Sequence, residues 1–385
     1  MRGSDKTTPY ETDRTTLTRL FRSGLLAVKG STAVEKRLEH SEIETPTKVI
    51  AVGKAAVSMY EGLPEAWQAF TPSLIITKTG HIGTAQFGRN VEALETSHPI
   101  PDGSSLNAGE TLLAFVQDCA PGDRLLLLVS GGASALVEHL QTGCSDDDLF
   151  RLTNEALSSG ANIIEINEKR KGISAIKGGK LLSHFKGSCV DVLAISDVCG
   201  DTMDVIGSGI GAEPQNRSFE YGAHIVASNL VAREAIVEHA ASIGLRIVAN
   251  AETMYDDVRD VADRIASDVE NGPSGIYIYG GEPTVVLPKK PGRGGRNQAL
   301  ALQLAKCIRN RRDITGLVAG TDGTDGPTDA AGAYLDGGTF DACSGAEDAL
   351  NSANSADFLA RAGDQIITGP TGTNVMDIAI ILKHP

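Results

Sequence analysis

The sequence RLLLLVSGGAS, residues 124–134, joins an unbroken run of apolar residues to a turn of small residues. Consecutive apolar side chains cannot alternate between core and solvent, so they indicate a strand that is buried on both faces. The serines and glycines that follow are typical of a tight connection from such a strand into a helix. This stretch therefore predicts a parallel β-sheet covered by helices.

Other short apolar runs repeat the pattern: KVIAVG (48–53), SLIITK (73–78), DVLAIS (191–196) and AHIVAS (223–228). Helix-like segments lie between most of them, for example SLNAGETLLAFVQDC (105–119). Strands that alternate with helices predict an α/β fold with a Rossmann-like, doubly wound parallel sheet. Ligands of such folds bind beyond the carboxyl ends of the strands.

A second set of predicted strands begins near Gly275 and comprises GIYIYGGE, PTVVLP, ITGLVAGTDG and VMDIAIIL. The stretch 232–271 before it is mostly helical in pattern and charged, so it is a candidate connection between two lobes. We therefore expect a large N-terminal domain over residues 12–240 and a smaller α/β domain over residues 241–385.

Composition narrows the class of protein. The 385 residues carry a formal net charge of −14, which opposes nucleic-acid binding. None of the six cysteines forms a CxxC pair or zinc-ligand spacing, which indicates reduced thiols. The polar opening MRGSDKTTPYETDRTT is not a signal peptide, and no apolar run is long enough to span a membrane. We expect a cytoplasmic protein whose partners are small molecules.

Two strand ends carry residues suited to anions. Lys54 follows Gly53, where it is placed to neutralise a phosphate or carboxylate, or is a solvated lysine at a turn. The turn 130–134 supplies Ser130, Gly131, Gly132 and Ser134 before a predicted helix; it either binds an anion through backbone N–H groups or allows tight packing.

Acidic residues follow other predicted strands. Asp197 in AISDVCGD is placed to activate a hydroxyl or hold Mg²⁺, or to cap a helix. Glu282 ends GIYIYGGE, and Arg296 in GRGGRNQ precedes an apolar helix, where it suits bidentate capture of carboxylate or phosphate. The loop 320–332 concentrates Asp322, Asp325 and Asp329, which bind Mg²⁺ or a substrate hydroxyl, or belong to a solvated loop.

Several common signatures are absent. GISAIKGGKLL (172–182) places its glycines wrongly for a Walker A loop, and no protein-kinase or nucleophile-elbow motif occurs. GSGIGA (207–212) does not directly follow a strand, so it is a poor dinucleotide fingerprint. A lone histidine such as His98 is more often structural than catalytic.

Read in order, nine strings resemble the glycerate 2-kinase family, in which a glycerate-kinase domain precedes a MOFRL domain. The strings are VIAVGKAA, SHPIPDG, VSGGASAL, INEKRKGISAIKGGKL, ISDVCGD, GGEPTVV, GRGGRNQ, AGTDGTDGPTDAAGA and GPTGTNVMD. They span nearly the whole chain. The resemblance implies ATP-dependent phosphorylation of D-glycerate at the 2-hydroxyl, giving 2-phosphoglycerate and ADP, with Mg²⁺ as cofactor.

The resemblance also implies an active site in a cleft between the two domains. Its expected catalytic residues are Lys54, Asp197, Glu282 and Arg296. Substrate or nucleotide contacts are expected from Ser130, Gly131, Gly132, Ser134, Asn229, Gly320, Thr321, Asp322 and Asn374. Asp322 and Asp325 are the expected metal ligands.

The chain departs from the family pattern at Gly172, Thr202, Ile210 and Ala299, and these changes affect the expected substrate and rate more than the fold. Two other functions stay open: an NAD(P)H-dependent hydroxypyruvate reductase, and a non-catalytic protein that binds small anions. The reductase needs a dinucleotide fingerprint after a strand, and the binding protein has no need of the acidic residues.

Overall fold

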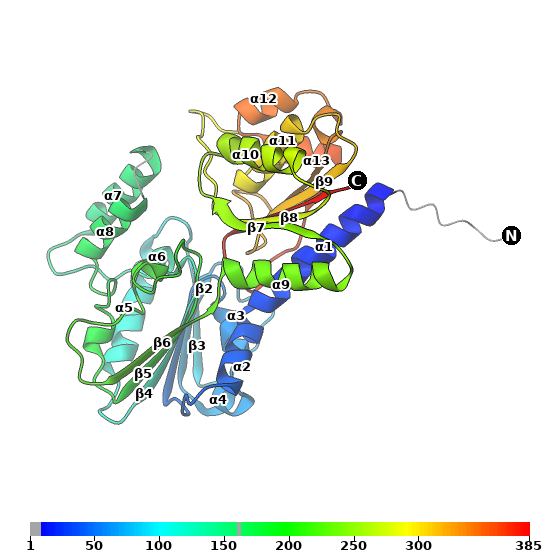
Figure 1. Ribbon diagram of the computed structural model, residues 1–385. Helices are drawn as coiled ribbons and strands as arrows, with labels where there is room; N and C mark the ends of the chain where they lie inside the picture. Colours follow the sequence, from blue (N-terminus) through cyan, green and yellow to red (C-terminus); the bar gives the residue numbers. More distant parts are fainter. Residues whose placement is uncertain (1–8, 160–162) are drawn as a thin grey trace. The chain divides into compact units, whose positions relative to one another are not determined.

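The computed structural model describes residues 9–159 and 163–385, which form two compact units. The parallel-sheet unit comprises Val28–Ser228 and Gly372–Asn374. The mixed-sheet unit comprises the chain up to Ala27, Asn229–Thr371 and Val375–Pro385. Each unit contains one six-stranded sheet, with helices packed on it (Figure 1).

All strands of the first sheet are parallel, in the order β3-β2-β1-β4-β5-β6. They are β1 (Lys48–Val52), β2 (Ser73–Lys78), β3 (Val91–Thr96), β4 (Arg124–Val129), β5 (Cys189–Ile195) and β6 (Glu220–Ala227). The predicted doubly wound sheet is thereby confirmed. Strand β3 was not predicted, because it lies at the sheet edge and is only partly buried, so it lacks a continuous apolar run.

Helices cover both faces of this sheet. Ile50 and Leu127 belong to the core under α5, while Val49 and Leu126 in the same strands are equally buried on the opposite face. The helices of this unit are α2 (Gly30–Glu39), α3 (Ala56–Glu61), α4 (Glu65–Phe70), α5 (Gly103–Gln117), α6 (Ala133–Leu136), α7 (Asp146–Ser159) and α8 (Ile163–Ile173), with 3₁₀ turns η1 (Leu182–His184) and η2 (Ile206–Ser208). Asp102 caps α5 through the Ser104 N–H, so the predicted helix here begins at a capping box.

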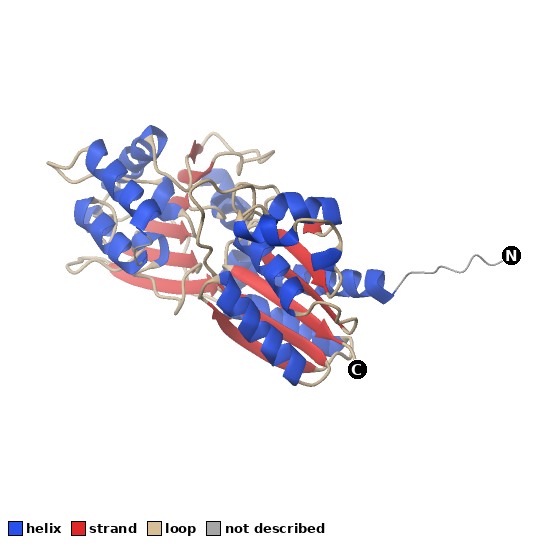
Figure 2. Cartoon of the chain, turned by 90° about the horizontal axis from the view of Figure 1, so that it is seen from above, coloured by secondary structure: helices blue, strands red, loops and turns tan. Residues whose placement is uncertain are grey.

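The second sheet is mixed, in the order β11-β10-β9-β12-β8-β7. Only β7 and β8 pair in parallel. The strands are β7 (Ile247–Met254), β8 (Gly275–Gly281), β9 (Ile314–Gly320), β10 (Gly332–Asp336), β11 (Gln365–Ile366) and β12 (Asp377–Lys383). The helices are α1 (Pro9–Val28), α9 (Asn229–Ser242), α10 (Val258–Asn271), α11 (Arg296–Cys307), α12 (Ala346–Asn351) and α13 (Ser355–Ala362), with the 3₁₀ turn η3 (Thr339–Asp341). Figure 2 shows the strands of the protein in red and its helices in blue.

One sequence-based expectation for this unit was wrong, and one strand was missed. PTVVLP is not a strand: it forms one isolated bridge at Thr284, and Val286 and Leu287 are 83% and 63% exposed. The prolines at both ends have no N–H to give a ladder. The stretch 232–271 contains β7 between two helices, which its polar residues conceal.

The compact units divide at Ser228, whereas the expected domain boundary lies at residue 240. The difference arises because α9 packs against β7 and β8 of the mixed sheet. The short segment Gly372–Asn374 belongs to the parallel-sheet unit although β12, which follows it closely, belongs to the other. In the described part of the chain, no helix combines the length and apolar character needed to cross a membrane.

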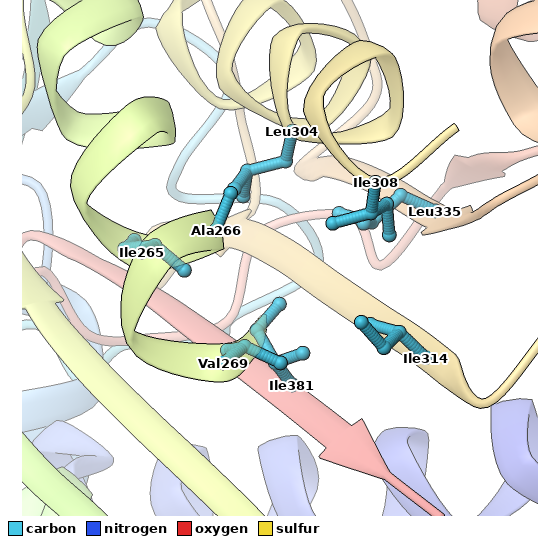
Figure 3. Close-up of a pocket in the computed structure, with 8 residues that line it drawn as sticks. All are labelled: Ile265, Ala266, Val269, Leu304, Ile308, Ile314, Leu335 and Ile381. Atoms are coloured by element: carbon cyan, nitrogen blue, oxygen red, sulfur yellow. The ribbon is translucent and has the colours of Figure 1, made fainter. Parts of the chain in front are cut away.

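The core of the mixed-sheet unit contains one small apolar cavity of about 10 Å³ (Figure 3). Its walls are aliphatic side chains of α10, α11, β9, β10 and β12: Ile265, Ala266, Val269, Leu304, Ile308, Ile314, Leu335 and Ile381. A space of this size and character is a packing defect, because it holds at most about one water and offers no polar partner.

Candidate active site

The strand order of the parallel sheet reverses between β1 and β4. The chain runs outward through β1, β2 and β3, then returns to β4 and continues outward on the other side. The loops that leave β1 and β4 therefore diverge, and a crevice at their carboxyl ends is the usual ligand site of such sheets. Lys54 follows β1, and the turn 130–134 follows β4.

These two loops are hydrogen-bonded to each other. The Lys54 N–H donates to the Gly131 carbonyl at 2.9 Å, and the Ala55 N–H donates to the Ser130 Oγ at 3.0 Å. Gly53, with φ of +128°, allows the approach, since a Cβ there would lie 2.1 Å from the Ser130 Oγ. The loop of Lys54 is thus fixed by the loop after β4.

Asp197, after β5, joins the same place. Its Oδ2 accepts a hydrogen bond from the Asn374 Nδ2 at 3.1 Å. A Cβ on Gly131 would lie 2.1 Å from both of these side-chain atoms, so only glycine lets them approach the loop. The predicted residues of the parallel-sheet unit are therefore brought together.

Two histidines that the motifs did not assign to the site lie beside Lys54. The His81 Nδ1 is 3.0 Å from the Lys54 carbonyl. The His98 ring and the Lys54 Cγ each lie 3.1 Å from the position of a Cβ on Gly132. His81 and His98 follow β2 and β3, so only the strand order reveals their proximity to Lys54. We call Lys54, His98, Ser130–Ser134, Asp197 and Asn374 the switch-point cluster.

The helix expected after the turn 130–134 is a single short turn, α6, of four residues. Gly132 precedes it with φ of +83°. A four-residue helix has little aligned backbone dipole, so this feature is a glycine loop more than a helix N-terminus. The Ser134 hydroxyl oxygen lies 2.7 Å from the Ser208 Oγ.

A second group of charges surrounds Arg296, the first residue of α11. The Arg296 Nε donates to the Asp377 Oδ2 at 2.5 Å, and Nη2 donates to Oδ1 at 3.3 Å. Nη1 donates to the Glu282 Oε1 at 2.5 Å. Burial alone would lower the pKa of Arg296, but Asp377 and Glu282 outweigh it and hold that pKa above its ordinary value. The predicted fork thus grips carboxylates of the protein itself.

Asp377 is the residue of this group that the sequence patterns did not single out. It is 1% exposed, begins β12, and pairs in register with Gly281 and Gly320 at the ends of β8 and β9. Its Oδ1 also accepts from the Asn297 Nδ2 at 2.9 Å. Its sequence signals were its place at the end of the string GPTGTNVMD and just before a long apolar run. We call Glu282, Arg296, Asn297 and Asp377 the arginine cluster.

Asp325, expected to bind a metal, instead lies at the N-terminus of α11. Its oxygens accept from the N–H groups of Asn297 and Gln298 at 3.0 and 2.8 Å, and from the Gln298 Nε2 at 3.0 Å. Burial raises the pKa of Asp325 to about 6, an effect that these N–H groups oppose. Asp325 thus caps α11 with three accepted hydrogen bonds, and its role as a metal ligand stays a prediction.

Asp322 has a different environment, since it is only partly buried and its Oδ1 accepts from the Thr324 N–H at 3.0 Å. It remains the candidate of the predicted pair. Among the residues that the structure describes, no three or more histidine, cysteine or acidic side chains form a group that could hold a metal ion.

Asn229 and Thr321 are used within the protein. The buried Asn229 Nδ2 donates to the Val375 and Asp377 carbonyls at 2.9 and 3.1 Å. The Thr321 Oγ1 donates to the Met376 carbonyl at 2.6 Å and accepts from the Val375 N–H at 2.8 Å. Both side chains therefore fix the start of β12. Gly320 ends β9, where a Cβ would come within 3.2 Å of the Asp377 Oδ1.

The departures from the family pattern have simple surroundings. Ile210 and Ala299 are buried and lie in the apolar core or in α11 facing it. A Cβ on Gly172 would meet no atom within 4 Å, so the structure leaves room there for a side chain. Thr202 lies in the loop after Asp201 and is exposed.

Comparison with known proteins agrees with this architecture. Residues 16–240 match the family described as "Domain of unknown function (DUF4147)", and residues 275–377 match the MOFRL family. A glycerate 2-kinase of Pyrococcus horikoshii is 33% identical, over 89% of this chain and 88% of that protein. The chain belongs to the glycerate 2-kinase family.

Two further proteins are similar to this chain over most of its length. The crystal structure of a glycerate kinase from Thermotoga maritima superposes with a TM-score of 0.83 at 30% identity, covering 97% of this chain and 100% of that one. A protein of Agrobacterium vitis, named provisionally as a hydroxypyruvate reductase, is 32% identical over 87% of this chain and 98% of its own length. Proteins that are similar to this chain thus carry different functional names.

Proposed function

We propose that this protein transfers the γ-phosphoryl group of ATP to the 2-hydroxyl of D-glycerate, giving 2-phosphoglycerate and ADP. The observation that carries the proposal is the switch-point cluster, where a lysine, an oriented aspartate and a glycine loop converge in a member of the glycerate 2-kinase family. Phosphoryl transfer depends mainly on positioning and on neutralising charge, and these are the groups that such a reaction needs.

Within this proposal, Asp197 binds the hydroxyl that attacks. Asn374 donates to its Oδ2 and so fixes the direction of the carboxylate. Asp197 accepts the proton of the glycerate 2-hydroxyl as that oxygen bonds to the γ-phosphorus and the bond from phosphorus to ADP breaks. The Lys54 ammonium neutralises phosphoryl oxygens, and the bond from the Lys54 N–H to the Gly131 carbonyl positions its loop.

The arginine cluster contributes in a different way. A guanidinium has five N–H donors, and the contacts of Arg296 with Asp377 and Glu282 use three. Its side chain is 36% exposed. We propose that the other donors bind a carboxylate or phosphate oxygen of a ligand, while Asp377 and Glu282 hold the guanidinium plane in place.

Mg²⁺ fits this reaction as a companion of ATP. In phosphoryl-transfer sites it is usually held by one or two carboxylates together with phosphate oxygens, whose charge it neutralises. Asp322 is the residue that we propose as its protein ligand. We also propose a cytoplasmic location, because all six cysteines are free thiols.

The hydroxypyruvate reductase alternative rests on the name of the Agrobacterium relative and on the strand order, which dinucleotide-binding sheets share. Against it, β1 is followed by Gly53 and Lys54 in place of a glycine-rich dinucleotide fingerprint. One pair of assays decides. The protein is incubated with D-glycerate and MgATP, and separately with hydroxypyruvate and NADH.

Phosphorus NMR of the first mixture should show ADP and 2-phosphoglycerate. A dominant 3-phosphoglycerate signal would refute the proposed position of transfer. Oxidation of NADH in the second mixture, without ADP in the first, would establish the reductase. Neither reaction, with saturable binding of glycerate, would establish a non-catalytic binding protein.

A further inference from the structure

A buried ion pair lies just beyond the glycine loop of the switch-point cluster. Lys177 is 0% exposed and Glu138 is 1% exposed, and the Lys177 Nζ donates to the Glu138 Oε2. The same Nζ donates to the Val137 carbonyl at 3.3 Å. Burial lowers the pKa of Lys177, and Glu138 opposes that shift. Buried charges are costly to desolvate, so the contacts that this pair organises are the first place to look for its role.

Both partners are attached to short loops. Glu138 follows α6 and Val137, and its Oε1 also accepts from the His139 N–H at 3.0 Å. Lys177 opens the turn Gly178–Gly179, in which both glycines have positive φ, 63° and 77°. Gly178 and Gly179 are the two glycines of KGGK, residues 177–180, within the stretch whose glycine spacing does not match a Walker A loop. The ion pair thus ties the end of α6 to the glycine turn.

The glycine turn is in turn bonded to the 3₁₀ turn η2 and its following residue. The Gly178 N–H donates to the Ser208 carbonyl at 3.0 Å, and the Gly179 N–H donates to the Gly209 carbonyl at 2.8 Å. A Cβ on Gly209 would lie 3.2 Å from the Gly178 Cα, so the two backbones are closely packed. The positions of the two turns are therefore coupled.

Ser208 connects the glycine turn back to the glycine loop 130–134. It has φ of 58°, a left-handed conformation that a residue other than glycine adopts only when its surroundings hold it there. In this conformation its Oγ lies 2.7 Å from the Ser134 Oγ. The connection therefore runs from Ser134 through Ser208, Gly178 and Lys177 to Glu138, and returns along the chain to Ser134.

We propose that Lys177 and Glu138 are positioning residues that hold Ser134 and the glycine loop 130–134 in the arrangement needed for phosphoryl transfer. This inference rests on the proposed function for its kinetic consequence. The loop lies between two fixed points, the Ser208 hydroxyl on one side and the Lys177 ammonium at Val137 and Glu138 on the other. Loosening either point lets the loop move, and displacements near 1 Å cost a phosphoryl-transfer site about 100-fold in rate.

The test separates positioning from stability. In the double variant Lys177→Met with Glu138→Leu, apolar side chains of similar size replace the pair, which often leaves the stability of a protein nearly unchanged. Here, however, the partly buried Arg170 loses the attraction of Glu138, so we expect a lower melting temperature in a protein that still folds, and a kcat/KM for glycerate with MgATP that is lower by about 10-fold or more. The single variant Lys177→Arg should keep much more of the wild-type rate than the double variant does, since it keeps the charge and a donor.

Hydrogen–deuterium exchange gives a readout that does not depend on turnover. Exchange of residues 130–138 should rise in the double variant, while the exchange of β1 and β4 stays unchanged. Ser208→Ala should produce the same rise and rate loss, and should add little to the double variant, because both changes break the same connection. Arg14→Met with Asp364→Leu, which replaces an ion pair of the mixed-sheet unit, is the matched control and should leave exchange of 130–138 unchanged.

Wild-type kinetics together with wild-type exchange in the folded double variant would overturn the proposal. If the double variant does not fold, Ser208→Ala decides, and normal rate and exchange in it would have the same consequence. If the wild-type protein does not phosphorylate glycerate, the proposed function fails, while the exchange of residues 130–138 still shows whether the pair holds the loop.

Discussion

The switch-point cluster and the arginine cluster both lie at strand ends, but they organise charge differently. In the switch-point cluster, backbone contacts and an amide hold Lys54 and Asp197, and glycines make room for them. In the arginine cluster, Arg296 is bonded directly to two carboxylates, one of them nearly fully buried. Removal of Arg296 therefore leaves Asp377 buried without its main counter-charge, whereas the backbone contacts of the Lys54 loop and the bond from Asn374 to Asp197 do not depend on the Lys54 side chain.

The sharpest consequence is a split between activity and stability. Lys54→Ala and Arg296→Ala should each lower kcat/KM for glycerate by about 100-fold or more, since lost charge stabilisation costs about 2–4 kcal/mol in the transition state. Arg296→Ala should also lower the free energy of unfolding, by about 3 kcal/mol, because it leaves Asp377 buried without its main counter-charge.

Steady-state kinetics and urea unfolding of both variants measure this contrast. Arg296→Lys is the informative control: it should restore part of the stability but little of the rate, since an ammonium cannot reproduce a planar fork. Unchanged stability of Arg296→Ala would contradict the structural role of the arginine cluster. Near-normal turnover of a folded Arg296→Ala would remove the arginine cluster from the proposed site.

The glycine loop provides the next test. Gly131→Ala should lower kcat/KM by about 10-fold or more, because its methyl group would overlap Asp197 and Asn374 and displace them. Gly122→Ala is the matched control, since a Cβ there meets no atom within 4 Å. Thermal melting accompanies the kinetics. If Gly131→Ala retains full activity, Asp197 need not be held against the loop.

In the acidic loop 320–332 of the mixed-sheet unit, we expect one aspartate to affect activity and another to affect stability. Excess EDTA should abolish turnover and Mg²⁺ should restore it. Asp322→Asn should raise the Mg²⁺ concentration needed for half-maximal rate by several-fold while leaving unfolding unchanged, because we propose this residue as the protein ligand.

Asp325→Asn is the counterpart, and it should lower the free energy of unfolding by about 1–2 kcal/mol, as the loss of a helix cap does, without changing the Mg²⁺ requirement. Magnesium titrations and urea unfolding of both variants give the result. The reverse pattern would return the metal to Asp325.

These contrasts also show which parts of the structure could be predicted from the sequence. The runs that became β1, β4 and β5 were recognisable because strands buried on both faces are continuously apolar. β3 and β7, which are partly exposed, have no such signature, whereas PTVVLP has an apolar run but is bounded by prolines and forms no strand. Local pattern thus predicted the central strands and the edge strand β6, and it missed the edge strands β3 and β7.

For the site, the sequence predicted residues but not their partners. Arg296 was singled out by its glycine turn, but its bond to Asp377 joins residues 81 positions apart and depends on strand pairing. Asp325 resembled a metal ligand because the convergence of two backbone N–H groups on it is invisible in sequence. The reach of the expected site across both units stays a prediction.

The smallest expected effect concerns a third region, the small cavity in the core of the mixed-sheet unit (Figure 3). It lies near Ile314 and Ile381, toward the end of the sheet opposite to the Gly320 and Asp377 pair. Val269→Ile adds one methylene to its wall and should raise the free energy of unfolding by about 0.5–1 kcal/mol if the group enters the space. Turnover should not change, because no residue of either cluster lines the cavity. A lower melting temperature would mean that the wall is too rigid to accept the group. A changed rate would show that the core and the arginine cluster are coupled, and would weaken the assignment of the stability loss in Arg296→Ala to Asp377 alone.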